Sequence, residues 1–187
     1  MKFIATELDG ATLVEMEPHR DERGYFARTM CVEEFGQAGL VTGFPQASQS
    51  HNLRAGTIRG MHFQDPPHAE TKLVRCVRGA VWDVIIDLRP GSPSYRRWQG
   101  FELSAANGRA LFIPEGFAHG FVVLSDVAEF CYKCTDVYDP TAEGGIPYDD
   151  PTVNVQWPDC GCEHKTSAKD KEHTPFAAQK FEYFEKY

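Results

Sequence analysis

Short runs of Val, Ile, Phe and Tyr recur along the chain between Gly, Pro, Asp and Asn residues, and sustained helical periodicity is scarce. Such runs are typical of β-strands bounded by turns. The expected strands cover residues 11–17, 24–30, 47–52, 57–63, 72–78, 80–88, 98–104, 110–113, 117–124 and 129–135. Many short strands at regular spacing within one domain predict a β-sandwich or a small β-barrel.

Helical patterns are few and short. Residues 31–40 predict a helix with early acidic residues and Gly39 as its stop, placed over an end or edge of the barrel. From Tyr138 onward the composition shifts to Asp, Pro, Thr and Gly, which predicts loops across the barrel mouth. Residues 166–187 are expected to be partly helical because Phe176, Phe181 and Phe184 fall near helical spacing. We therefore expect one domain over residues 1–187, with a barrel core at about 11–138 and a loop-rich, helical region at 139–187.

Composition argues against some classes of binding partner and against a disulfide-rich fold. The chain has 19 basic and 27 acidic residues, a net charge of −8 and no basic cluster, which argues against nucleic-acid binding. It has no apolar run of membrane-spanning length and no apolar signal segment at its start, so we expect a soluble, cytoplasmic protein without membrane contacts. Six cysteines in 187 residues do not form a disulfide framework.

Three ionisable residues, Arg59, His62 and Lys72, interrupt otherwise apolar strand-like segments. Interior strands normally take apolar side chains, so these charged groups favour either a functional site or a surface strand with scattered charges, and the stretch alone leaves both open. Arg59 and His62 are three residues apart and would face opposite sides of a regular strand. Both can serve one pocket only if Gly60 marks a β-bulge, or if the arginine serves a neighbouring subunit.

Three separated motifs carry a family resemblance. They are Arg-Gly-Met-His-Phe-Gln at 59–64, Pro-Glu-Gly-Phe-Ala-His-Gly-Phe at 114–121 and Cys-Tyr-Lys-Cys-Thr-Asp-Val-Tyr at 131–138. Together they resemble the dTDP-4-dehydrorhamnose 3,5-epimerase family, whose members act on nucleotide-linked 4-keto-6-deoxy sugars in deoxysugar biosynthesis. The resemblance runs from about residue 21 to residue 170. It implies an all-β, cupin-like jelly-roll barrel that needs no cofactor or metal, and a homodimer with strands able to exchange between subunits.

The same resemblance implies catalytic roles. The C4 ketone of such a substrate acidifies the protons on C3 and C5, so the reaction needs a general base, and this would be His62. Asp170 would be the carboxylate that orients His62. Tyr132 would be the acid on the opposite side, with Tyr138 as a second candidate, and Lys72 would stabilise the enolate oxygen. From composition alone, the preferred interpretation of Tyr132 is a buried residue bonded to backbone, and that of Asp170 is a member of a solvated charge run. For Lys72, a strand-edge charge that discourages aggregation is a reasonable alternative.

Substrate contacts are also carried over from the resemblance, at Arg23, Gln46, Arg59, His119, Glu143 and Lys169. Arg59 has the strongest physical argument, because a guanidinium matches phosphate oxygens bidentately. Two positions depart from the family pattern. Arg28 stands where an acidic residue is usual, and Ser48 stands where Asn is usual. Both departures leave open which nucleotide and which sugar the protein takes.

Other functions remain open at the level of sequence. A C3-only epimerase or a 3,4-ketoisomerase would keep His62, and a non-catalytic sugar-nucleotide binding protein would not exchange substrate protons. A metal-dependent cupin oxygenase or isomerase would need a set such as His62, His68, Glu70 and His119, but Gln64 occupies the place of a usual ligand. Cys131 and Cys134 would face opposite sides of a strand, and the cluster of Cys160, Cys162 and His164 is a weak metal signal.

Overall fold

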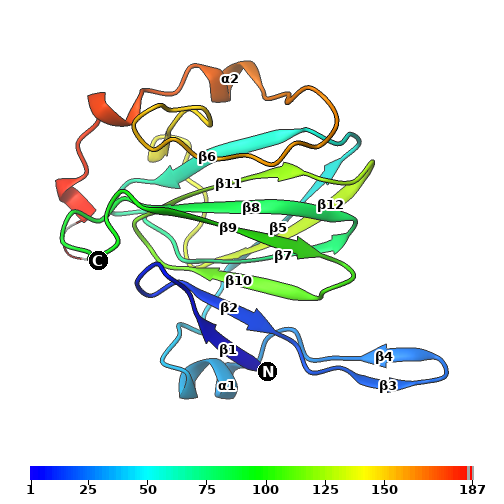
Figure 1. Cartoon of the computed structure of the whole chain (residues 1–187). Coiled ribbons are helices and arrows are strands. Elements are labelled where there is room, and N and C mark those ends of the chain that lie inside the picture. Colours follow the sequence, from blue (N-terminus) through cyan, green and yellow to red (C-terminus); the bar gives the residue numbers. More distant parts are fainter. Residues whose placement is uncertain (185, 187) are drawn as a thin grey trace.

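Two antiparallel β-sheets face each other in the computed structural model, which describes residues 1–184 and 186 (Figure 1). The six-stranded sheet has the order β1 (Lys2–Ala5), β2 (Thr12–Glu15), β10 (Arg109–Ile113), β7 (Lys72–Arg78), β12 (Ala128–Cys134) and β5 (Gln46–Asn52). The five-stranded sheet has the order β13 (Glu143–Gly145), β6 (Ile58–Gln64), β11 (Phe117–Val123), β8 (Ala80–Asp87) and β9 (Trp98–Ser104). The predicted all-β architecture is confirmed.

A separate hairpin, β3 (His19–Asp21) with β4 (Gly24–Phe26), projects from the body of the molecule (Figure 1). The strand predicted over residues 24–30 is wrong beyond Phe26, because no neighbouring strand pairs with the later residues of this chain. The strands β1, β3 and β13 were not predicted. β13 has the sequence Glu-Gly-Gly, whose weak β-propensity is overridden by pairing with β6.

Alternation along the strands directs one row of side chains into the space between the sheets. On β7 this row contains Lys72, Val74 and Cys76, and on β12 it contains Phe130 and Tyr132. The apolar members join a buried cluster that also includes Ile85, Leu111 and Phe121. Lys72 and Tyr132 therefore extend a core row, and their polar groups reach the interior because of strand parity.

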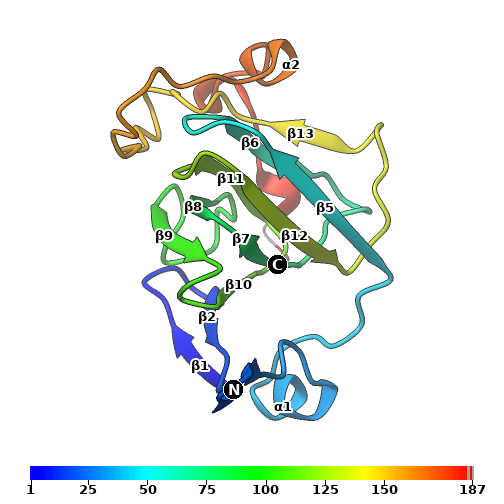
Figure 2. The same ribbon diagram turned by 90° about the vertical axis from the view of Figure 1, so that its right-hand side faces the viewer.

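The outer face of each sheet is covered by a short helical segment. The helix α1 (Val32–Gln37), shorter than predicted, places the fully buried Phe35 against Leu73 and Phe112 on the six-stranded sheet. Gly39 follows the helix with a positive φ of +74°, as expected of a helix stop. Figure 2 shows α1 at one end of the molecule and α2 (Ala168–Lys171) at the other.

After α2 the chain makes two 3-10 turns, Phe176–Ala178 and Glu182–Phe184, and buries Phe176, Phe181 and Phe184 on the outer face of the five-stranded sheet. The predicted partial helicity of this tail is confirmed up to Phe184, while residues 185 and 187 lie outside the described residues. No helix in the described part of the chain is long and apolar enough to cross a membrane.

Candidate active site

Two adjoining cavities lie at the end of the barrel interior. The first, of about 450 Å³, is lined from both sheets by Gln46, Ser48, His62, Phe63, Gln64, Glu70, Lys72, Tyr132, Cys134, Tyr138 and Glu143. The second, of about 410 Å³, is lined by Thr57, Ile58, Arg59, His62, Glu143, Lys165, Thr166, Ser167, Lys169 and Asp170. His62 and Glu143 line both, so they stand where the two cavities meet.

A β-bulge in β6 brings Arg59 and His62 to the same cavity. His62 pairs with His119 and Arg59 pairs with Phe121, so two residues of β6 oppose the single residue between these partners on β11. Gly60 lies in this bulge with a φ of +115°, and a Cβ there would lie 2.6 Å from the Cα of Gly120. The predicted bulge at Gly60 is confirmed, and it explains how residues three apart serve one pocket.

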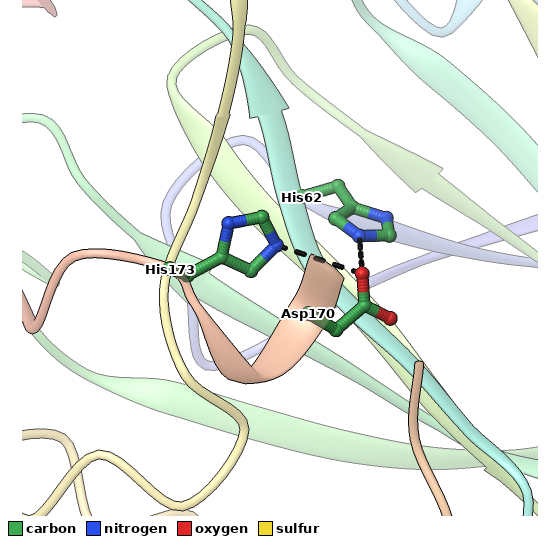
Figure 3. Close-up of side chains that lie close together, drawn as sticks. All are labelled: His62, Asp170 and His173. Atoms are coloured by element: carbon green, nitrogen blue, oxygen red, sulfur yellow. Dashed lines mark hydrogen bonds and ion pairs between the residues drawn. The ribbon is translucent and has the colours of Figure 1, made fainter. Parts of the chain in front are cut away.

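His62 and Asp170 form a close pair (Figure 3). The His62 Nε2 lies 2.8 Å from Asp170 Oδ1, while Asp170 Oδ2 accepts hydrogen bonds from the Gly60 N–H and the Thr166 hydroxyl, each at 3.3 Å. Burial alone would raise the pKa of Asp170, but the hydrogen bond and charge of His62 outweigh it and lower this pKa to about 2. Asp170 is therefore a carboxylate at neutral pH, suited to orient an imidazole and to stabilise an imidazolium.

Tyr132 reaches the first cavity from β12. Its ring lies edge-on to Phe130 and His119, and its hydroxyl is 3.5 Å from the Ser50 hydroxyl. Burial raises the pKa of Tyr132 well above its ordinary value. The side chain is therefore a neutral phenol at neutral pH and carries a proton that it can donate.

Lys72 is paired with Glu70 inside the same cavity. The Lys72 Nζ lies 2.7 Å from Glu70 Oε1, and the two side chains are 10% and 8% exposed. The Glu70 carboxylate keeps the ammonium in place in a site of low solvent access. A charged donor held in this way needs little reorganisation when negative charge develops beside it.

Tyr138 lies after the end of β12 and reaches the cavity because its segment is held by two glutamines. The Gln46 side chain accepts the backbone N–H of Tyr138 at 3.0 Å, and the Gln64 side chain accepts that of Asp139 at 2.7 Å. The Tyr138 hydroxyl donates to Glu143, and this hydrogen bond raises the pKa of Tyr138. Gln64 thus has a structural role at the cavity wall.

Glu143 also pairs with Lys169, which donates from Nζ to the same carboxylate oxygen at 2.5 Å. Burial raises the pKa of Glu143, but the hydrogen bonds from Lys169 and Tyr138 outweigh burial and hold this pKa below its usual range. The predicted site residues Glu143 and Lys169 therefore meet at the junction of the two cavities. Arg59 lines the second cavity, with its Nε donating to the Asn52 side chain at 2.7 Å.

His119 lies behind the cavity wall. It is 4% exposed, stacks on Phe130 and places its Nε2 2.7 Å from Asp83 Oδ2. Burial raises the pKa of Asp83, although the charge of His119 partly offsets it. A contact between His119 and substrate stays a prediction, because the ring touches Tyr132 without lining either cavity.

Neither of the two cavities described above is lined by Arg23 or Arg28. Arg23 lies at the tip of the projecting hairpin, 83% exposed and paired with Asp21, while Arg28 pairs with Glu34 at 2.7 Å. Ser48, the other departure from the family pattern, does line the first cavity. The contacts of Arg23 and Arg28 with substrate stay predictions.

The alternative cupin metal set of His62, His68, Glu70 and His119 is not assembled among the described residues. His68 pairs with Asp136 and Asp139, His119 pairs with Asp83, and Glu70 pairs with Lys72. In the tail, Cys160 and His164 each contact the backbone oxygen of Pro158. Cys134 lines the first cavity from the interior face of β12.

The sequence interpretation missed His173. Its Nε2 lies 3.6 Å from Asp170 Oδ1, and its ring meets the His62 ring edge-on at 5.5 Å (Figure 3). Burial lowers the pKa of His173, and the neighbouring His62 lowers it further. The available signal was the spacing of three residues from Asp170, which brings side chains together on a helical turn.

Comparisons with known proteins agree with this geometry. A family model described as dTDP-4-dehydrorhamnose 3,5-epimerase matches residues 5–178. The dTDP-4-dehydrorhamnose 3,5-epimerase of Methanothermobacter thermautotrophicus is 48% identical over 158 residues, 84% of each chain. The dTDP-4-dehydrorhamnose 3-epimerase of Streptomyces niveus is 41% identical over 84% of this chain and 76% of its own.

A crystal structure of a similar protein aligns with this chain over nearly its whole length. The dTDP-6-deoxy-D-glucose-3,5-epimerase of Legionella pneumophila, in complex with dTDP-4-keto-L-rhamnose, aligns with a TM-score of 0.91 and 37% identity. The alignment covers 97% of this chain and 96% of that one. The protein described here belongs to the dTDP-4-dehydrorhamnose 3,5-epimerase family.

Proposed function

We propose that this protein epimerises C3 and C5 of a dTDP-linked 4-keto-6-deoxyhexose, with His62 as base and Tyr132 as acid. Family membership makes it an isomerase of nucleotide sugars. One observation carries the assignment of roles: a carboxylate-paired imidazole, a neutral phenol and a buried ammonium line a single cavity. These are the base, acid and oxyanion donor that inversion next to a ketone requires.

The reaction follows from the chemistry of the C4 ketone. The Nε2 of His62 faces Asp170, and Figure 3 shows Nδ1 on the side of the ring away from that carboxylate. Nδ1 is therefore the atom that takes the substrate proton. The electron pair of the broken C–H bond moves onto the C4 oxygen and gives an enolate, which the ammonium of Lys72 stabilises. Tyr132 then returns a proton to the carbon from the opposite face, and the C4 ketone re-forms.

The second cavity suits the diphosphate of the substrate. Three cationic side chains, Arg59, Lys165 and Lys169, line this hollow beside the base, against the two carboxylates of Glu143 and Asp170. Guanidinium and ammonium groups bind phosphate oxygens by charge-assisted hydrogen bonds. The sugar would then extend from this cavity past His62 into the first one.

We also propose a homodimer. Phe26 and Tyr25 on the projecting hairpin are 77% and 49% exposed, and burying a phenylalanine side chain contributes roughly 1.5 to 3 kcal/mol. A second copy that covers this hairpin would also bring Arg23 and Arg28 to another chain's cavity. Phe26→Asp should shift the sedimentation mass toward the monomer, and Leu53→Asp, at a site 74% exposed elsewhere, is the matched control.

The function is tested by incubation with dTDP-4-keto-6-deoxyglucose in heavy water. Mass spectrometry of the product should find deuterium at both C3 and C5, whereas deuterium at C3 alone would match the activity named for the Streptomyces niveus relative. His62→Ala should abolish incorporation at both carbons, and retained incorporation would remove His62 from the base role. Tyr132→Phe should keep deuterium exchange better than net inversion, and full inversion would remove Tyr132 from the acid role.

A further inference from the structure

Two imidazoles converge on a single carboxylate oxygen in this protein. The Nε2 atoms of His62 and His173 lie 2.8 and 3.6 Å from the same Oδ1 of Asp170 (Figure 3). The ligand atoms of these three residues all lie within 4.8 Å of one another. Among residues 1–184 and 186, no other group of three His, Cys, Asp or Glu side chains reaches this arrangement.

His173 is held in this position without a hydrogen bond of its own. Its side chain is 11% exposed, and its Nε2 is buried with no hydrogen-bond partner among the described residues. The ring packs on Gly145, where a Cβ would come within 2.3 to 2.5 Å of three ring atoms. Gly145 pairs with His62 across β13 and β6, so the lack of a side chain there lets the second imidazole lie beside the first.

We propose that His62, Asp170 and His173 form a site for a divalent transition-metal ion such as Zn²⁺, and that the bound ion switches the enzyme off. Two imidazoles and one carboxylate suit zinc, which prefers nitrogen and oxygen ligands at about 2.0 to 2.2 Å. At tetrahedral angles those bond lengths place ligand atoms roughly 3.3 Å apart. The two observed separations from Oδ1, 2.8 and 3.6 Å, lie on either side of this value.

The switch follows from the single proton of a neutral imidazole. In the active form Nε2 of His62 carries that proton and donates it to Asp170, which leaves the lone pair on Nδ1. A metal ion on Nε2 takes the lone pair of that atom, so the proton moves to Nδ1 and no net proton is released. Nδ1 then cannot accept the proton of the substrate. This consequence rests on the proposed role of His62 as base.

The expected kinetics depend on where the ion lies. His62 and Asp170 line the second cavity, whereas His173, the third ligand, lines neither cavity. The ion would therefore lie at the edge of the second cavity, beside Asp170 and on the opposite side of the His62 ring from Nδ1. We expect substrate still to bind, so Zn²⁺ should lower kcat without raising KM, and a chelator should restore kcat. An ion that occupied the substrate position itself would raise KM instead.

The first experiment measures inhibition by Zn²⁺ in the Cys160→Ser, Cys162→Ser background, which removes a separate cluster of thiols. His173→Phe keeps a ring against Gly145 but cannot bind the ion. Because loss of even an outer-shell partner costs roughly 10- to 100-fold in metal affinity, this variant should need at least about tenfold more Zn²⁺. His51→Phe, at an exposed histidine next to Glu129, is the matched control and should be inhibited like its parent.

His173→Asn is the second variant should His173→Phe fail to fold, and it should lose sensitivity to Zn²⁺ in the same way. Equal inhibition of the parent and a folded His173 variant by Zn²⁺ would overturn the proposal. An increase of KM at constant kcat on addition of Zn²⁺ would overturn it as well.

The second experiment does not depend on activity. Co²⁺ bound to the same background should give visible d–d absorption at one equivalent without thiolate charge-transfer bands, and the His173 variants should lose it. Absence of this His173-dependent signal would overturn the metal site. Binding of Co²⁺ and Zn²⁺ through His173 with full activity would instead overturn Nδ1 of His62 as the base, and with it the switch, while the metal site would stand.

Discussion

The charge of Asp170 can be removed while its shape is kept, by Asp170→Asn. The amide oxygen can still accept the Nε2 proton of His62 at the 2.8 Å position, but it no longer stabilises the imidazolium formed during proton abstraction. The pKa of Asp170 is lowered from 3.8 to about 2 in the folded protein, chiefly because the hydrogen bond and charge of His62 outweigh burial. At about 1.4 kcal/mol for each pKa unit, the net shift, to which Gly60 and Ser167 also contribute, corresponds to about 2 kcal/mol, and we take this as the order of magnitude of the His62–Asp170 interaction.

If Asp170→Asn raises the free-energy barrier for proton abstraction by about 2 kcal/mol, kcat should fall roughly 30-fold. The acidic limb of the pH–rate profile should also move to lower pH, because an imidazolium without its carboxylate partner loses its proton more readily. The assay is deuterium incorporation at C3 and C5, followed against pH. A variant with an unchanged rate and an unmoved acidic limb would refute the assigned role of Asp170.

The same substitution has a stability consequence whose sign can be worked out. A carboxyl whose pKa is lower in the folded than in the unfolded state stabilises the fold above its unfolded pKa and loses that contribution as the pH falls. The difference in unfolding free energy between the parent and Asp170→Asn should therefore be full above about pH 4 and should shrink toward pH 2.

Asp150→Asn is the matched control for this series. Asp150 is 3% exposed and accepts backbone hydrogen bonds from Thr152, Val153 and Phe176 in the same C-terminal region. Its substitution should lower stability and leave the acidic limb of the pH–rate profile in place. A shift of that limb in Asp150→Asn would mean that loss of packing, and not loss of charge, explains the Asp170 result.

Three further predictions concern the cavity, the bulge and a buried ion pair. Lys72→Met should lower kcat by about 100-fold or more, whereas Lys133→Met, at the neighbouring position to Tyr132 on β12, should have little effect on turnover. Gly60→Ala should cost about 2 kcal/mol or more in chemical denaturation because its Cβ meets backbone atoms, while Gly36→Ala, with open space in α1, should stabilise by up to about 1 kcal/mol. Asp87→Ala should cost about 3 to 5 kcal/mol in the same measurement, because it leaves a buried guanidinium unpaired, and a loss below about 1 kcal/mol would contradict this reasoning.

Much of the barrel was predictable from local pattern. β7 and β9 begin and end at the residues expected from alternation and turn signals, and the other predicted strands from β5 to β12 differ from expectation by one residue at one end or, in β6 and β12, at both ends. The bulge at Gly60 was one of two explanations open from the sequence, because Arg59 and His62 could share a pocket through a break in strand parity or Arg59 could serve a neighbouring subunit. Each of these features depends on neighbours within a few residues along the chain.

The candidate site was predictable only in part. The family resemblance implied that His62, Tyr132 and Lys72 share one site, and the structure brings all three to the first cavity. Arg23 and Arg28 line neither of the two cavities, because Arg23 lies at the tip of the projecting hairpin and Arg28, just after the hairpin, pairs with Glu34 of α1.

By itself, the sequence determined the all-β class, most strand limits and the order of the catalytic motifs, because these depend on period and residue type. Only the tertiary structure decided that Asp83 supports His119 and that His173 shares an oxygen of Asp170 with His62. It also decided that Glu-Gly-Gly becomes β13 and leaves room for a second imidazole. The physical reason is that strand pairing and side-chain contacts bring together residues that are 36 to more than 100 positions apart in the sequence. The local pattern of residues does not say which distant strands pair or in which register.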